Sequence, residues 1–334
     1  MEMIEKKQLT GLDIWKFTMA VLIVALHTQF LKETTVYEYL HLFEDMAVPC
    51  FMAISAYFFF HKIYSLPANE NSRPYLWHTV KRLVILFAAW SILVLPMTYM
   101  RFYSIASLKE IVFAWCLTQT AQGYWFIKAL LYNTILFYFC RKMIPLIILS
   151  LIGLTLYIYF AYNYIYHFDS FALELHPYYT FFYNMAYFAA GVWLAKYPQV
   201  IEKCKGNKLV VMFGVWLILY SAACHNELIA PVYKLMSFSL LFPIFYHQSL
   251  GEGSPSLCKT LRNMSIILYM SQFVLIWIYD LVCTFVISPD NDLLVILQHS
   301  VTRFFTVLTC SVIIAGIILK NEDKKYFAFL KYLH

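Results

Sequence analysis

The stretch IWKFTMAVLIVALHTQF, residues 14–30, decides how this chain folds. It is apolar along almost its whole length, and it is long enough to cross the hydrocarbon core of a bilayer as an α-helix. Lys16 and His27 are its only ionisable side chains. Eleven residues of α-helix make three turns plus about 20° and rise about 16.5 Å, so both side chains lie on one stripe. Ionisable groups in a membrane span usually face a bundle interior or a wet cavity, which makes this pair a candidate functional site.

The composition of the whole chain indicates a membrane protein. Of its 334 residues 62% are hydrophobic and 13% are charged, and the mean hydropathy is +0.65, which leaves too little polar surface for a soluble globule. Continuous apolar runs favour helices over strands, because lipid offers no partner for an unpaired backbone amide. The sequence therefore predicts an all-α, polytopic bundle of about ten transmembrane helices, over residues 12–31, 43–61, 80–100, 123–140, 143–165, 179–196, 208–224, 230–249, 263–287 and 296–319.

The basic residues predict an orientation for this bundle. Most of the 25 Lys and Arg residues fall in alternate loops and helix ends, on the side of the N-terminus. Under the positive-inside rule this side is cytoplasmic, so we expect an even number of spans and both termini in the cytoplasm. The net charge of +6 then reflects basic loops that face anionic lipid, and no nucleic-acid partner is expected.

The chain is expected to be a single transmembrane domain over residues 1–334. The first apolar run is longer than the core of a signal peptide and has no small-residue cleavage site, so we expect it to be retained. The polar stretches between the predicted spans are too short for a separate soluble domain. Any catalysis must then occur within the bundle.

Five segments together resemble a known family. In LDIWKFTMAVLIVALHT, residues 12–28, a basic residue is followed by ten residues and then His. This pattern is similar to the first-span signature of the integral-membrane acyltransferase family 3. Four later segments resemble further patterns of that family in the same order: VPCFMAISAYFF (48–59), GYWFIKALL (123–131), YFAAGVWLAK (187–196) and NMSIILYMSQFVLIW (263–277). The resemblance covers most of the chain, and the first-span motif is its specific part.

Three positions depart from the family pattern. Lys16 stands where the family often has Arg, which keeps the charge but loses the planar fork that binds phosphate in a bidentate manner. Ala56 replaces a Gly, a mild change if that backbone is helical. Gln272 stands where the family often has His, and an amide does not shuttle a proton at neutral pH.

The resemblance implies transfer of an acyl group, commonly acetyl from acetyl-CoA, to a hydroxyl or amine of an envelope glycan or lipid-linked saccharide. Lys16 would meet a phosphate of the CoA donor at the cytoplasmic end, and His27 would stand beside the thioester as general base. An acyl-imidazole intermediate on His27 is the alternative. This activity implies a multi-pass protein of a bacterial-type cytoplasmic membrane, in contact with membrane lipids. It requires no metal, and the sequence leaves a homo-oligomer open.

Four further residues are candidates for this site. Glu44 and Asp45 lie one short loop after His27, where either could orient the imidazole; alternatively, both are solvated acids at a helix N-terminus. Arg82 is a second candidate for a CoA phosphate, and Trp125 a further candidate for cofactor contact. Their alternatives are topology anchoring for Arg82 and interfacial anchoring for Trp125.

Two other classes of protein would also bury a Lys and a His in a span. A transporter or flippase for an envelope precursor would explain many spans, but it predicts matching halves with spans broken by Gly or Pro, and the sequence shows none. A sensor or assembly subunit would need no cofactor. Binding of acetyl-CoA separates both classes from an acyltransferase.

Overall fold

The chain forms a bundle of α-helices. The computed structural model describes residues 10–67, 70–94, 96, 124–169, 180–248, 255–285, 295–296, 298–322 and 324, and these ranges contain no strand. The all-α prediction is therefore confirmed. The helices are α1 (Thr10–Thr28), α2 (Tyr37–Asp45), α3 (Ala47–Tyr64), α4 (Arg73–Leu93), α7 (Trp125–Cys140), α8 (Leu146–Tyr166), α10 (Phe181–Lys196), α11 (Pro198–Glu202), α12 (Asn207–His225), α13 (Ala230–His247), α14 (Pro255–Phe285) and α16 (Ser300–Asn321).

Each of the ten predicted spans overlaps at least one of these helices. By length and composition, seven helical segments of the described chain could cross a membrane, and α2 with α3 counts as one of them. α7 is apolar but shorter, at 16 residues. The multi-pass prediction is therefore confirmed. The count of about ten spans stays a prediction, because seven helical segments of the described chain meet these criteria. The cytoplasmic termini also stay predictions, and residues 1–9 and 325–334 lie outside the described part.

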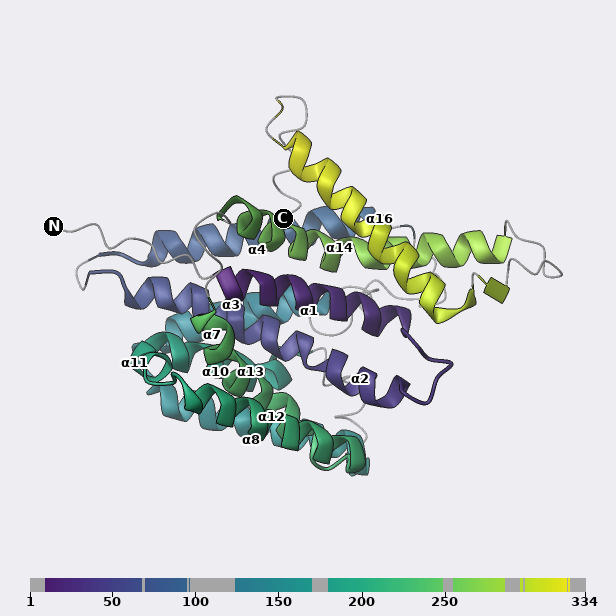
Figure 1. The fold of residues 1–334 in the computed structure, drawn as a ribbon. Helices are drawn as coiled ribbons and strands as arrows, with labels where there is room; N and C mark the ends of the chain where they lie inside the picture. The colour runs from purple at the N-terminus through teal and green to yellow at the C-terminus, as the bar shows by residue number, and fades with distance from the viewer. Residues whose placement is uncertain are drawn as a thin grey trace.

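α1 and α3 lie in the middle of the bundle. α14 packs along α1, and α16 packs on α14 and α1 (Figure 1). On the other side, α10 packs along α3, α8 covers α10, and α12 pairs with α13 (Figure 1). Among the described helices, α4 packs mainly on α7. We call the end at which α1, α4 and α14 begin the inner end, after the predicted orientation, and the opposite end the outer end.

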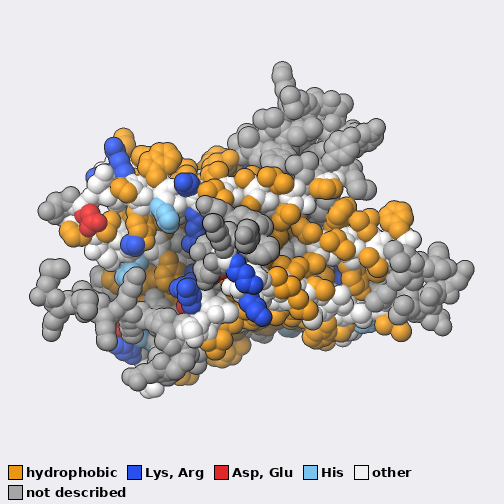
Figure 2. Space-filling view, turned by 90° about the horizontal axis from the view of Figure 1, so that it is seen from above, with side chains coloured by type: hydrophobic (Ala, Val, Ile, Leu, Met, Phe, Trp, Pro, Cys, Tyr) orange, Lys and Arg blue, Asp and Glu red, His pale blue; other side chains and the backbone are white. Residues whose placement is uncertain are grey.

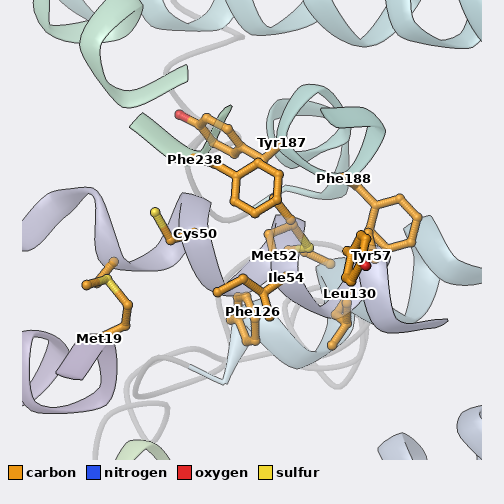
Figure 3. Packing of buried hydrophobic residues seen from close by; sticks show 14 of the residues in the cluster. Met19, Cys50, Met52, Ile54, Tyr57, Phe126, Leu130, Tyr187, Phe188 and Phe238 are labelled. Carbon is orange, nitrogen blue, oxygen red and sulfur yellow. The ribbon is translucent and has the colours of Figure 1, made fainter. Parts of the chain in front are cut away.

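Close packing of α3 holds the centre together. Figure 3 shows side chains of α3, α7, α10 and α13 in contact, among them Phe126, Tyr187 and Phe238, which are at most 8% exposed. A Cβ atom on Gly191 of α10 would lie 2.1 Å from the carbonyl oxygen of Ala53 in α3. Only glycine permits this approach of two backbones, a device common between membrane helices.

The surface separates apolar from basic side chains. Hydrophobic side chains cover much of the face in Figure 2, whereas Lys and Arg gather toward the inner end. Among the seven candidate spans of the described chain, α12 and α4 are the least buried. In these helices 11% and 22% of the most apolar 18-residue stretch is buried. Such outward apolar surface fits lipid as the solvent.

Two helices differ from the predicted boundaries near the candidate site. The second span was predicted from residue 43, but its helical segment begins at Tyr37, and α2 and α3 meet at Met46. The third was predicted over 80–100, but α4 begins at Arg73, because Pro74 is favourable in a first helical turn. The apolar count missed the polar first turns of both helices.

Candidate functional site

α1 and α14 run side by side in the same direction and meet at two levels (Figure 1). At the inner level, Arg262 Nη1 of α14 lies 3.7 Å from Asp13 Oδ2 of α1. At the outer level, the ring centroids of Phe273 and His27 lie 4.7 Å apart. Arg262 and Phe273 are eleven residues apart, the same separation as the ionisable pair of α1. α14 therefore lines the stripe of α1 that joins the two levels.

The inner level is a cluster of four charged side chains from three helices. Lys16 interacts electrostatically with Asp13, Arg262 and Arg82, and its ammonium lies 4.1 Å from the centre of the Phe58 ring of α3. Asp13 is 3% exposed, and its Oδ1 has no hydrogen-bond partner among the described residues. The fold thus brings the two predicted phosphate candidates, Lys16 and Arg82, into one cluster.

The charge of this inner cluster suits an anion. Three cations face a single carboxylate, so two positive charges are left uncompensated within the cluster. Lys16 is partly buried, whereas Arg82 is exposed, so an anion beside Lys16 is screened less by water. This arrangement can hold a phosphate group, with Lys16 as the stronger partner.

The outer level surrounds His27 with further ionisable groups. Asp45 and His41 of α2 lie close enough to His27 for electrostatic interaction. Within the described chain, the imidazole makes no hydrogen bond, neither to Glu44 nor to Asp45, so the predicted orienting contact is not formed in this structure. Asp45 instead accepts from Lys234 Nζ of α13 at 2.7 Å, a partly buried pair in which the side chains are 29% and 15% exposed.

Glu44 is the most deeply buried acid of the outer level. It is 0% exposed, and neither carboxyl oxygen has a hydrogen-bond partner among the residues that the structure describes. Asp45 and Tyr37 are its electrostatic neighbours. The alternative of a solvated acid at a helix N-terminus is wrong for Glu44, because it lies at the end of α2 and is excluded from solvent.

His41 was not singled out from the sequence, although its spacing points to it. His41 precedes Glu44 by three residues and Asp45 by four, so the three share one face of α2. Its ring lies 5.4 Å from that of Tyr37, and its buried Nδ1 has no partner in the described chain. The outer level therefore contains two imidazoles and two carboxyl groups.

Trp125 lies at the outer level, away from Lys16 and Arg82. It opens α7, is 8% exposed, and follows Tyr124, whose ring lies 5.6 Å from that of Phe273. A cofactor contact at Trp125 would thus involve the acyl end of a donor that has its phosphates at the inner cluster. The structure does not bring this residue together with the phosphate candidates.

The two other departures from the family pattern are both buried in helices. Ala56 lies in α3 at 0% exposure, so its backbone is helical, as a mild replacement of Gly requires. Gln272 lies in α14 beside Phe273; its Nε2 donates to the carbonyl of Tyr269, and its Oε1 has no partner within the described ranges. Gln272 thus offers a free acceptor near the level of His27.

The loop after α1 is hydrogen-bonded to the start of α16 at the outer end. Glu33 accepts hydrogen bonds from the hydroxyl and from the backbone N–H of Ser300, the first residue of α16, the latter at 2.9 Å. The Ser300 hydroxyl, above all, holds the pKa of this exposed carboxyl below its ordinary value. The loop after His27 is thereby tied to the start of the last helix. No metal-binding group of three or more His, Cys, Asp or Glu side chains occurs in the described part.

Comparison with known proteins identifies the family. A family model described as an acyltransferase domain, acyltransferase family 3, matches residues 9–320, nearly the whole chain and both levels of the site. Comparisons with curated proteins and with solved structures give no match. The match gives no support to the transporter or assembly-subunit alternatives. The chain therefore belongs to the integral-membrane acyltransferase family 3, and it is a multi-pass membrane acyltransferase.

Proposed function

We propose that this protein transfers an acyl group, most simply acetyl from acetyl-CoA, to a hydroxyl or amine of an extracytoplasmic glycan or lipid-linked saccharide. The observation that carries the proposal is the pair of levels on α1. A cationic cluster surrounds Lys16, and an imidazole and carboxyl cluster surrounds His27. About 16.5 Å of helix separates them, a length that the pantetheine arm of CoA can span.

The inner cluster supplies the donor site in this proposal. Lys16, Arg82 and Arg262 bind the CoA phosphates, and Asp13 holds Arg262 in place. Arg262 is an addition to the predicted set, and its guanidinium provides the planar fork that Lys16 lacks. The acyl thioester then reaches the level of His27 and Trp125.

The outer level supplies the proton transfer. An acceptor hydroxyl or amine attacks the thioester carbonyl, and His27 takes the acceptor proton as the new C–O or C–N bond forms. The C–S bond breaks, and the CoA thiolate leaves and takes the proton from the His27 imidazolium, which restores the neutral imidazole. Asp45, fixed by Lys234, stabilises the imidazolium through its charge. Glu44 is the second carboxyl group available to position the acceptor.

The mechanism of His27 can be decided by mass spectrometry. Enzyme quenched with acetyl-CoA in the absence of acceptor should carry no acetyl group on His27 if the imidazole acts only as a base. A stoichiometric acetyl adduct on His27 would instead establish an acyl-imidazole intermediate.

The direction of the site, in the predicted orientation of the bundle, supports a cytoplasmic membrane as the place of this reaction. With the inner end in the cytoplasm, the donor enters from the compartment that holds CoA, and the acceptor is met at the opposite face. A bacterial-type cytoplasmic membrane and an envelope acceptor satisfy this geometry. Radiolabelled acetyl recovered in the envelope glycan or lipid-linked saccharide fraction would identify the acceptor.

CoA binding to the purified full-length protein tests the proposal. Lys16→Ala should weaken CoA binding by about tenfold or more, the loss of one charge-assisted contact, with a smaller loss for the exposed Arg82→Ala. His27→Ala should keep CoA affinity and lower kcat by about 10²- to 10⁴-fold. Lys208→Ala, outside both levels, is the matched control. Failure of the wild-type protein to bind acetyl-CoA would reject the proposed function.

A further inference from the structure

A second basic site lies at the inner end, apart from the donor cluster. A cavity of about 170 Å³ opens between the start of α4 and the end of α7. Three cations line it, Arg73, Arg141 and Lys142, with one carboxylate, Glu70. A water molecule occupies about 30 Å³ in the liquid, so the cavity has room for a phosphate group. None of the donor-cluster residues lines it.

Arg141 is held in a fixed position at this cavity. Its Nη2 donates to the Ser72 hydroxyl at 2.7 Å, and its Nη1 donates to the Tyr138 carbonyl at 2.8 Å. The guanidinium carbon also lies 3.7 Å from the centre of the Tyr138 ring, and the Tyr138 hydroxyl is 2.9 Å from that of Ser72. An Arg side chain has five N–H groups, and these hydrogen bonds use only some of them.

The side chains of the other two cations of the cavity form no hydrogen bond or ion pair among the described residues. The side chains of Arg73 and Lys142 are exposed, and neither forms a hydrogen bond or ion pair with any residue that the structure describes. The Glu70 carboxylate is exposed as well and balances one of the three positive charges at most. The cavity therefore keeps a net positive charge that a ligand phosphate can compensate.

The surroundings of the cavity point to a lipid. Phe139, which lines the cavity, is 54% exposed, and the neighbouring Met143 and Ile147 are 83% and 52% exposed. Outward apolar side chains on a membrane bundle contact acyl chains. A headgroup in the cavity would thus keep its acyl chains along the ends of α7 and α8.

We propose that this cavity binds the phosphate of an anionic phospholipid headgroup and that the bound lipid fastens α4 to α7. A basic pocket between helices at the cytoplasmic level is the usual form of such a site. The effect on α4 follows from its packing, since α7 is its main neighbour among the described helices and only 22% of its most apolar 18-residue stretch is buried. Because Arg82 lies on α4, the lipid also steadies one residue of the donor cluster.

The test measures lipid affinity without any acyl donor, so that its outcome is independent of the proposed function. Full-length protein in dodecyl maltoside micelles is titrated with dioleoyl phosphatidylglycerol or dioleoyl phosphatidylcholine, and the melting temperature Tm is followed. We expect an apparent affinity at least about tenfold higher for the phosphatidylglycerol. The double variant Arg73→Gln/Lys142→Gln should lose about tenfold or more of it, while Lys259→Gln, an exposed inner-end control, should change it less than about twofold.

Other results would overturn the proposal. Equal stabilisation by the two lipids, or an unchanged affinity in the double variant, would show that the cavity does not select an anionic headgroup. Inorganic phosphate that stabilises the wild type as the phosphatidylglycerol does, and fails in the double variant, would assign the cavity to a soluble phosphate. The side chains of Arg73 and Lys142 form no hydrogen bond or ion pair with the described residues, and the backbone N–H of Arg73, which donates to Asn71 Oδ1 at 3.0 Å, is kept in the variant, so the replacement should leave the fold intact.

Discussion

Replacement of Glu44 by Met is the sharpest test of the outer level. Both carboxyl oxygens are buried without a hydrogen-bond partner among the described residues, in a side chain that is 0% exposed. A buried polar group without a partner costs about 1–3 kcal/mol, whereas an apolar side chain of similar shape does not bear that cost. Glu44→Met should therefore raise the free energy of unfolding by about 1–3 kcal/mol.

The expected shift is measurable by differential scanning fluorimetry. At about 2 °C per kcal/mol, the lower end of the range for large domains, Tm should rise by about 2–6 °C. Glu38→Met is the matched control, because Glu38 lies on the same helix and is exposed. Its stability should stay within about 0.5 kcal/mol of the wild type.

Activity should change in the opposite direction. If Glu44 serves the reaction, Glu44→Met should lower the rate of thiol release from acetyl-CoA, in membranes that carry the acceptor, by about 10²-fold or more. A higher Tm together with a lower rate is the result expected for a carboxyl group that destabilises the fold but is needed for activity. A lower Tm would refute the reasoning about its burial, and a higher Tm with unchanged activity would refute its functional role.

Three further predictions concern the packing around the site. A double-mutant cycle of Asp45→Asn and Lys234→Met, measured by chemical denaturation, should give a coupling energy of about 1–2 kcal/mol, because the ion pair is only partly buried. Zero coupling would show that the ion pair does not stabilise the contact between α2 and α13. Gly191→Ala should lower stability by about 1–3 kcal/mol, because its Cβ would meet the α3 backbone, whereas Gly214→Ala, with nothing within 4 Å, should not; equal melting temperatures would contradict this. The lowered pKa of Glu33 means that its bonds to α16 stabilise the fold above its ordinary pKa and are lost as pH falls through the lowered value; Glu33→Gln should flatten this acid dependence of Tm, and an unchanged dependence would count against the tie.

The sequence was sufficient for the helices because their cause is local. A continuous apolar run must form a helix in lipid, and each of the ten predicted runs overlaps at least one helix. The predicted helix starts were wrong where the first turn is polar, as at the start of α2 at Tyr37 and of α4 at Arg73. Hydropathy does not register these turns, because they lie outside the apolar stretch that it measures.

The site was predicted only in part, because partners come from separate helices. The eleven-residue spacing on α1 is a property of one helix, and so is visible in the sequence. Arg262, beside Asp13, and Lys234, beside Asp45, lie on helices far along the chain. A span that is apolar on all sides gives no sign of which face is turned inward, since lipid and the bundle interior favour the same side chains.

By itself, the sequence determined that this chain is a helical membrane protein with Lys16 and His27 on one stripe, and its resemblance pointed to the acyltransferase family that the family match confirmed. Only the tertiary structure decided that α14 lies along that stripe, that Glu44 is buried, and that the inner and outer charges form separate clusters. The physical reason is that helix formation in lipid depends on local hydrogen bonding, whereas burial and charge pairing depend on which helices pack together.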